Sequence, residues 1–138
     1  MRRTAILLAM GFAVPALAAD LAVLAGSWTA LRAERDGAPV AELIGHRLEF
    51  TGDRFQITGK DGRMLYAGTY NIDDTAQPAA IDFPHDGGEA AGQDWEGIYR
   101  LDGTMLTIVD DAPDTRKGRP SDFTTAAGSG RVLLVFVR

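Results

Sequence analysis

The feature that most constrains the fold of this chain is a turn motif that recurs between short segments of alternating hydrophobicity. The dipeptide Asp-Gly occurs at residues 36–37, 61–62, 86–87 and 102–103. Asp followed by Gly suits the positive φ angles of tight hairpin turns. We therefore expect each copy to reverse the chain between two antiparallel strands.

The segments between these turns have the period of two that is typical of strands, and residues 132–138 are apolar at almost every position. We expect a short helical piece only within residues 39–44. The pattern predicts strands at residues 27–34, 46–50, 54–58, 64–72, 81–83, 98–101, 105–109 and 132–138. About eight short strands at regular spacing predict an all-β fold, an antiparallel β-barrel, in a single domain covering residues 19–138.

Composition excludes several classes of protein. The chain has 138 residues, with 14 Lys and Arg against 19 Asp and Glu, and no Cys. Without Cys there is no disulfide scaffold, thiolate zinc site or thiol nucleophile. The acidic balance argues against a nucleic-acid partner. No apolar run reaches the roughly 20 residues that span a bilayer, so we expect no membrane span.

Residues 1–18 have the three parts of a secretory signal peptide. A positive start, Met1-Arg2-Arg3, is followed by apolar residues 5–14 and by the small residues of Ala16-Leu17-Ala18. Cleavage is expected after Ala18 or one residue later. The alternative is a buried N-terminal helix. The signal peptide predicts an exported protein, periplasmic or secreted.

The first strand opens with Gly26-Ser27-Trp28, which resembles the Gly-x-Trp signature of the lipocalins. In that fold the Trp plugs the closed end of the barrel and an Arg near the last strand lies over the indole. The resemblance implies that Gly26 and Trp28 close the barrel here, with Arg138 or Arg131 as the cationic partner.

Motifs along the rest of the chain extend the resemblance. They are Glu34–Val40, Phe50–Phe55, Gly68-Thr69-Tyr70, Pro78–Phe83, Gly97–Gly103, Arg119–Phe123 and Gly128–Phe136. Together they resemble a family of small exported lipocalin-like β-barrel domains that is expanded in planctomycetes. The resemblance covers residues 24–138, implies the barrel fold and brings no catalytic residues.

No motif for catalysis is present, so we expect a protein that is not an enzyme and has no catalytic residues, metal or cofactor. The best local group of metal-type side chains is His85-Asp86 with Glu89, on an expected mobile loop over residues 83–94. These residues lack the spacing of known metal motifs, and we expect His85 to be solvated. The acidic cluster Asp110-Asp111 with Asp114 is expected to cap turns, and the basic run 116–119 to be a solvated loop.

The most suggestive functional feature is a set of aromatic and methionine side chains that alternation can place inside the barrel. The predicted ligand-binding residues are Phe55, Met64, Tyr66, Tyr70, Trp95, Tyr99 and Met105. Such a barrel either fills its interior or holds one small ligand. We therefore expect a small apolar or amphipathic molecule in the barrel mouth. The alternative is a filled barrel that contacts an unidentified protein partner through residues 84–94 and 110–120; a cavity of roughly 300 Å³ or more would favour ligand binding.

Overall fold

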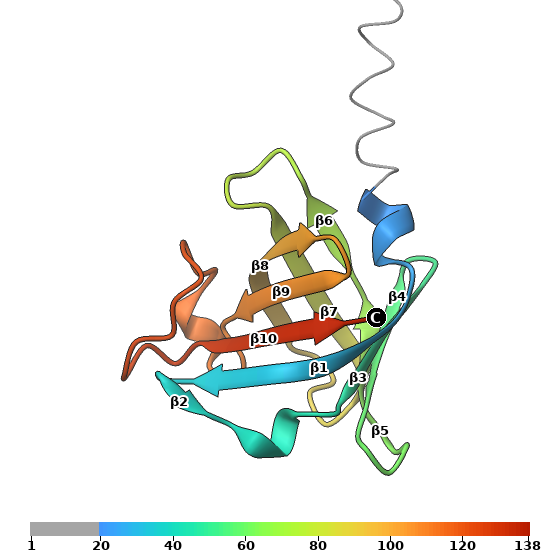
Figure 1. The fold of residues 1–138 in the computed structure, drawn as a ribbon, viewed down its shortest axis with the longest axis horizontal. Helices are drawn as coiled ribbons and strands as arrows, with labels where there is room; N and C mark the ends of the chain where they lie inside the picture. Colours follow the sequence, from blue (N-terminus) through green and yellow to red (C-terminus); the bar gives the residue numbers. More distant parts are fainter. Residues whose placement is uncertain (1–19) are drawn as a thin grey trace, which may run out of the picture.

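The computed structural model describes residues 20–138, and the expected signal peptide lies outside this range. Residues 20–24 form one helical turn, and the rest of the chain is built from short strands and loops (Figure 1). The elements in chain order are β1 (Gly26–Arg35), β2 (Ala38–Pro39), the 3-10 helix η1 (Ala41–Leu43), β3 (Arg47–Thr51), β4 (Arg54–Thr58), β5 (Met64–Thr69), β6 (Asn71–Asp73), β7 (Ala80–Gly88), β8 (Asp94–Asp102), β9 (Met105–Asp110), the 3-10 helix η2 (Thr115–Lys117) and β10 (Val132–Val137).

The strands form a closed antiparallel β-barrel, as the sequence predicts. The order around it is β1, β3, β4, β5, β7, β8, β9 and β10, and β10 pairs with β1 from Thr29↔Val137 to Arg35↔Val132. The short strands β2 and β6 pair with β1 and β7 and stand outside this circuit. Closure leaves the barrel strands without a free edge, which removes the surface along which sheets aggregate.

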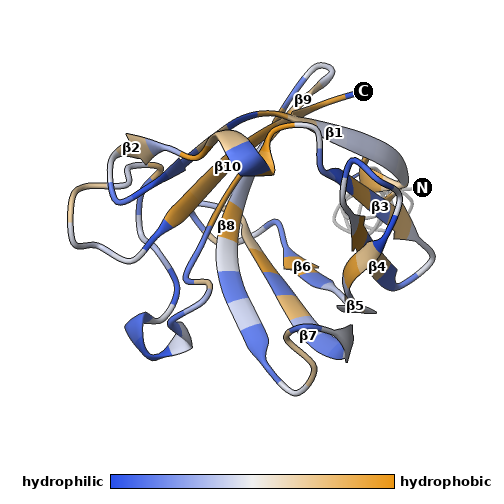
Figure 2. Ribbon diagram, turned by 90° about the horizontal axis from the view of Figure 1, so that it is seen from below, coloured by the Kyte–Doolittle hydropathy of each residue, from blue (hydrophilic) through white to orange (hydrophobic). Residues whose placement is uncertain are grey.

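Alternation places one side of each strand in the core. Along β7, buried residues alternate with more exposed ones from Ile81 to Asp86. Strand β10, in contrast, is hydrophobic almost throughout (Figure 2). The inner face of β10 adds Phe136 to the barrel core. Its outer face, Leu133 and Val135, packs with Ile98 and Val109, and Phe123 from the segment between β9 and β10 packs against this cluster. This outer packing explains why β10 is apolar on both sides.

The Asp-Gly copies at 36–37 and 61–62 lie in turns that reverse the chain. In the copy at 102–103, Asp102 ends β8 and Gly103 begins the turn to β9. Asp36 and Gly37 have φ angles of 53° and 80°, the left-handed values expected of this dipeptide. The expected reversal at 86–87 is wrong, because Gly87 pairs with Ala67 of β5 and the strand continues to Gly88. The expected loop over residues 83–94 is wrong for the same reason: β7 occupies its first half.

One end of the barrel is plugged by Trp28. This indole is fully buried, and its N–H donates to the Leu24 carbonyl at 2.9 Å. The Arg138 guanidinium lies 4.1 Å from the centre of the Trp28 ring and also donates to the Ala25 carbonyl at 2.9 Å. Arg131 lies elsewhere, 3.8 Å from the Asp122 carboxylate. Of the two candidate arginines, Arg138 is therefore the one that covers the indole.

Candidate functional site

Most of the barrel interior is filled by side chains. Among the predicted ligand-binding residues, Phe55, Tyr70 and Tyr99 are at most 5% exposed and belong to the packed core. The Tyr70 hydroxyl donates to the Gly52 carbonyl at 3.2 Å, and the Tyr99 hydroxyl donates to the Asp20 carboxylate at 2.7 Å. Both hydroxyls are thus bonded to the protein, and neither is presented to a ligand.

The expectation that Met64 and Met105 point inward is wrong. They are 43% and 41% exposed. Leu106 and Ile108 occupy the core positions of β9, so Met105 falls on the outer side by alternation. Met64 begins β5 beside a register shift against β4, where a strand no longer keeps its simple alternation.

A pocket of about 70 Å³ lies at the end of the barrel away from Trp28, near η1. Two of the predicted residues, Tyr66 and Trp95, form part of its wall. Its other apolar lining residues are Leu43, Ile57, Ala112, Val132, Leu134 and Phe136. Three polar side chains also line it: Arg35, His46 and Asp110. The pocket is well below the roughly 300 Å³ typical of drug-sized ligands, so it admits only a small group.

The sequence missed the most unusual side chain of this pocket, Asp110. The expectation that Asp110 and Asp111 cap exposed turns is only partly right: they are 5% and 0% exposed. Asp111 accepts from the Glu96 N–H at 2.9 Å, while Asp110 lines the pocket and accepts from the Ala112 N–H at 3.1 Å. Burial raises the pKa of the Asp110 carboxyl to about 7. Alternation through Leu106 and Ile108 was the pattern that could have placed Asp110 inside.

Alternation along the sequence does not predict that Arg35 lines the pocket, because a register shift interrupts the alternation of β1. Trp28 and Ala30 are buried, the pairing with β10 shifts between Ala30 and Arg32, and Ala33 is the next buried residue. Arg35 follows at the same spacing and lines the pocket from an exposed position at its rim. Simple period-two counting from Trp28 gives the opposite face for Arg35.

A glycine makes room for Asp110. Gly97 of β8 pairs with Asp110 of β9. A Cβ atom at Gly97 would lie 2.8 Å from the Val109 carbonyl oxygen and 3.1 Å from the Asp110 Cβ. The two strands therefore approach closely at this point, and the carboxyl side chain fits inside the barrel because its cross-strand neighbour has none.

Replacing Gly97 with Ala is expected to lower the free energy of unfolding by about 1–3 kcal/mol, measured by urea denaturation, because the new methyl group forces the strands apart. Gly87→Ala is the matched control. There the nearest atoms to the added carbon are the Ala67 and Met64 side chains at 3.7 and 4.0 Å, which are ordinary contacts, so the change should stay within about 0.5 kcal/mol. Equal stability of the Gly97→Ala variant and the wild type would contradict the close approach.

His85 lies inside the barrel, and the expectation of a solvated loop histidine is wrong. It is 5% exposed, and its Nδ1 lies 2.7 Å from the Phe83 carbonyl oxygen. A carbonyl only accepts, so Nδ1 carries the hydrogen. Its Nε2 has no hydrogen-bond partner within residues 20–138. The imidazole packs against Trp95 and Phe55, with ring centres 4.2 and 5.0 Å away, and burial lowers its pKa.

His85, Asp86 and Glu89 do not converge on a common centre. Asp86 is on the outer side of β7, where its carboxylate pairs with the Arg54 guanidinium at 2.8 Å, and Glu89 is exposed. Within residues 20–138, no group of three or more metal-type side chains is placed to hold an ion. A metal site built from these three residues therefore has no geometric basis.

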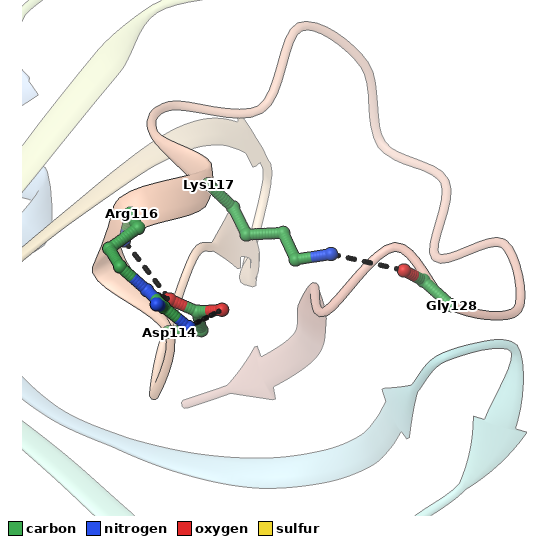
Figure 3. Close-up of polar contacts among 4 residues, drawn as sticks. All are labelled: Asp114, Arg116, Lys117 and Gly128. Atoms are coloured by element: carbon green, nitrogen blue, oxygen red, sulfur yellow. Dashed lines mark hydrogen bonds and ion pairs between the residues drawn. The ribbon is translucent and has the colours of Figure 1, made fainter.

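The segment between β9 and β10 is tied to the barrel and to itself. Arg119 donates to the Gly97 carbonyl at 2.8 Å and pairs with the Asp82 carboxylate at 2.7 Å. Figure 3 shows Arg116 paired with Asp114 and Lys117 donating to the Gly128 carbonyl, contacts of 2.9 and 3.2 Å. The basic run is thus only partly solvated, because Arg119 anchors the segment on the outside of β7 and β8.

The fold and this geometry define a class of protein: a small closed antiparallel barrel, plugged at one end, with a small and mostly apolar pocket at the other. Comparison of the chain with protein-family models, with curated proteins and with solved structures finds no match. Among residues 20–138, no helix has the length and apolar character needed to cross a membrane.

Proposed function

We propose that this protein is exported and binds a small amphipathic molecule at the open end of its barrel. The observation that carries the proposal is the pocket itself, which is lined by the aromatic side chains of Tyr66 and Trp95 together with the polar groups of Arg35 and Asp110. Binding sites for small molecules combine an apolar lining with a few placed polar groups in this way.

The size of the pocket limits what can enter it. A site for one water needs roughly 10–15 Å³ by this measure, so about 70 Å³ holds on the order of five to seven non-hydrogen atoms. The ligand is therefore either very small or inserts one end and leaves the remainder outside. Export is inferred from residues 1–18, and the acidic, cysteine-free composition is compatible with the periplasm.

Titration with 1-pentanol, a neutral amphiphile of suitable size, tests the pocket. Trp95 lines the pocket and Trp28 lies at the far end, so binding is expected to change the tryptophan emission of Trp95. Replacing Leu134 with Phe should weaken binding at least about tenfold, because the larger ring fills the pocket. Leu31→Phe is the control at an exposed position of β1 and should bind like the wild type. No response to pentanol, or an unchanged affinity in the Leu134→Phe variant, would refute the proposal.

The filled interior favours a second candidate, a module that contacts another protein without a bound ligand. Core residues such as Phe50, Tyr70 and Phe83 occupy the space that a larger ligand would need. Native mass spectrometry of the protein from its own envelope separates the two candidates. Extra mass of a small molecule that is lost on denaturation supports ligand binding, whereas a co-purified protein with no such mass supports the second candidate.

A further inference from the structure

Asp110 is a buried acid without a charged partner in the structure. Its side chain is at the wall of the pocket and is 5% exposed. One hydrogen bond reaches it, from the Ala112 N–H to Oδ1 at 3.1 Å. None of the ion pairs within residues 20–138 involves Asp110. A carboxylate has about four acceptor positions, and burying one is unfavourable unless a cation or further donors reach it.

The walls around this carboxyl are also suited to positive charge. The Trp95 N–H is already used, since it donates to the Gln93 side-chain oxygen at 3.0 Å. Trp95 therefore offers the pocket its aromatic ring and no free donor. The Tyr66 ring stands edge to face against it, with ring centres 4.8 Å apart. Aromatic faces attract cations and repel anions. The aromatic wall and the Asp110 carboxylate therefore both favour positively charged ligands.

Two basic side chains line the same pocket, and neither forms an ion pair with the Asp110 carboxylate. Arg35 is exposed at the rim and makes no ion pair with Asp110 in the structure, although its charge reaches the carboxyl and lowers its pKa somewhat. His46 has its pKa lowered, mainly by burial, and is therefore neutral near pH 7. The inner part of the pocket is thus free of fixed positive charge.

We propose that the pocket takes a small primary ammonium group, with the Asp110 carboxylate as its counter-ion and Trp95 and Tyr66 as its aromatic walls. This inference rests on the proposed function and names its ligand class: an alkylamine, or a longer molecule that ends in one. The pocket volume sets the inserted part at roughly five to seven non-hydrogen atoms including the nitrogen.

Binding of such a cation depends on pH through Asp110. Because burial raises the pKa of this carboxyl to about 7, it is mostly protonated at pH 6 and mostly ionised at pH 8. An alkylamine stays protonated across this range. The other titratable or charged groups that face Asp110 are Arg35 from β1, His46 before β3, Tyr66 from β5 and the neighbouring Asp111 of β9. None of them replaces the missing counter-ion.

The test compares n-pentylammonium, 1-pentanol and pentanoate by isothermal titration at pH 8. The ammonium is expected to bind at least about tenfold more tightly than the other two. Its affinity should rise about tenfold between pH 6 and pH 8 in the wild type, a result that needs no variant. Asp110→Asn should lose at least about tenfold in affinity for the ammonium. Asp94→Asn is the matched control, because it removes the same charge beside Trp95 from an exposed position, and its affinities should stay within twofold.

The outcomes separate this inference from the proposed function. If pentanol binds and the ammonium binds no better, or if Asp110→Asn binds the ammonium unchanged, the ammonium site is refuted while the pocket stands. If pentanoate binds best and Arg35→Ala abolishes its binding, the site takes anions and the inference is overturned. If none of the three probes binds the wild type, both the ammonium site and the proposed function are refuted.

Discussion

Replacing Trp28 with Ala is expected to lower the free energy of unfolding by about 3–5 kcal/mol, the range for removing a large aromatic side chain from a core. The indole is fully buried at the plugged end of the barrel. Its loss leaves a cavity, removes the hydrogen bond to the Leu24 carbonyl and takes away the surface on which Arg138 lies. Urea denaturation followed by far-UV circular dichroism measures the change.

Two controls show whether the plug acts as described. Trp28→Phe keeps an aromatic ring but loses the N–H donor, so it should cost clearly less than Trp28→Ala. Arg138→Ala should cost about 0.5–1 kcal/mol through the lost cation–π contact, and more than Arg131→Ala, whose guanidinium lies elsewhere. A Trp28→Ala variant with the unfolding midpoint of the wild type would contradict the assignment of Trp28 to the core of the barrel end.

Replacing Asp110 with Asn is expected to stabilise the protein at pH 8 by about 2–4 kcal/mol, since each pKa unit corresponds to about 1.4 kcal/mol. The pKa of Asp110 is raised from 3.8 to about 7 by burial. Between these values the folded protein keeps a proton that the unfolded chain releases. Stability from this group therefore falls as pH rises from about 4 to about 7, and above pH 7 the cost stays constant. Asn carries no such charge and can still accept from the Ala112 N–H.

The measurement is the difference between the unfolding free energies of Asp110→Asn and the wild type at pH 5, 6, 7 and 8. The difference should grow with pH up to about 7. His46 and His85, with pKa values lowered by burial, give a slope of the opposite sign below about pH 6.5, but they are common to both proteins and cancel. Asp86→Asn is the control: its pKa is lowered by Arg54, so its removal should bring no gain at pH 8. A difference that is constant with pH would exclude a raised pKa at Asp110.

The two experiments on Asp110 together describe one trade-off. The same substitution that should stabilise the folded state should also weaken ammonium binding at least about tenfold. Functional sites commonly hold groups whose pKa values burial has shifted, at a cost in stability. In this protein the cost falls on the Asp110 carboxyl, which is buried at the wall of the pocket.

Local sequence patterns determined much of this fold. Residues 54–58 alternate, and β4 has the same bounds; the Asp-Gly pair at 102–103 turns the chain between β8 and β9. Both patterns act over a few residues, where side-chain direction and φ preference decide the outcome. The resemblance of the Gly-x-Trp start to the lipocalin signature also implied that Trp28 is the plug and left Arg138 and Arg131 as candidate partners, and the structure places Arg138 over the indole.

Tertiary structure decided which residues line the pocket end of the barrel. Which side of a strand faces inward depends on register shifts, such as the one after Ala30 that turns Arg35 to the pocket, and on pairing across strands, which keeps residues 86–87 inside β7. Asp110 and His85 are polar by composition, and only closure of the barrel buries them. The sequence by itself determined that strands alternate and where most of them turn. The closed barrel decided which polar groups lie in the interior. Burial depends on all eight strands together, so the sequence of one segment does not predict it.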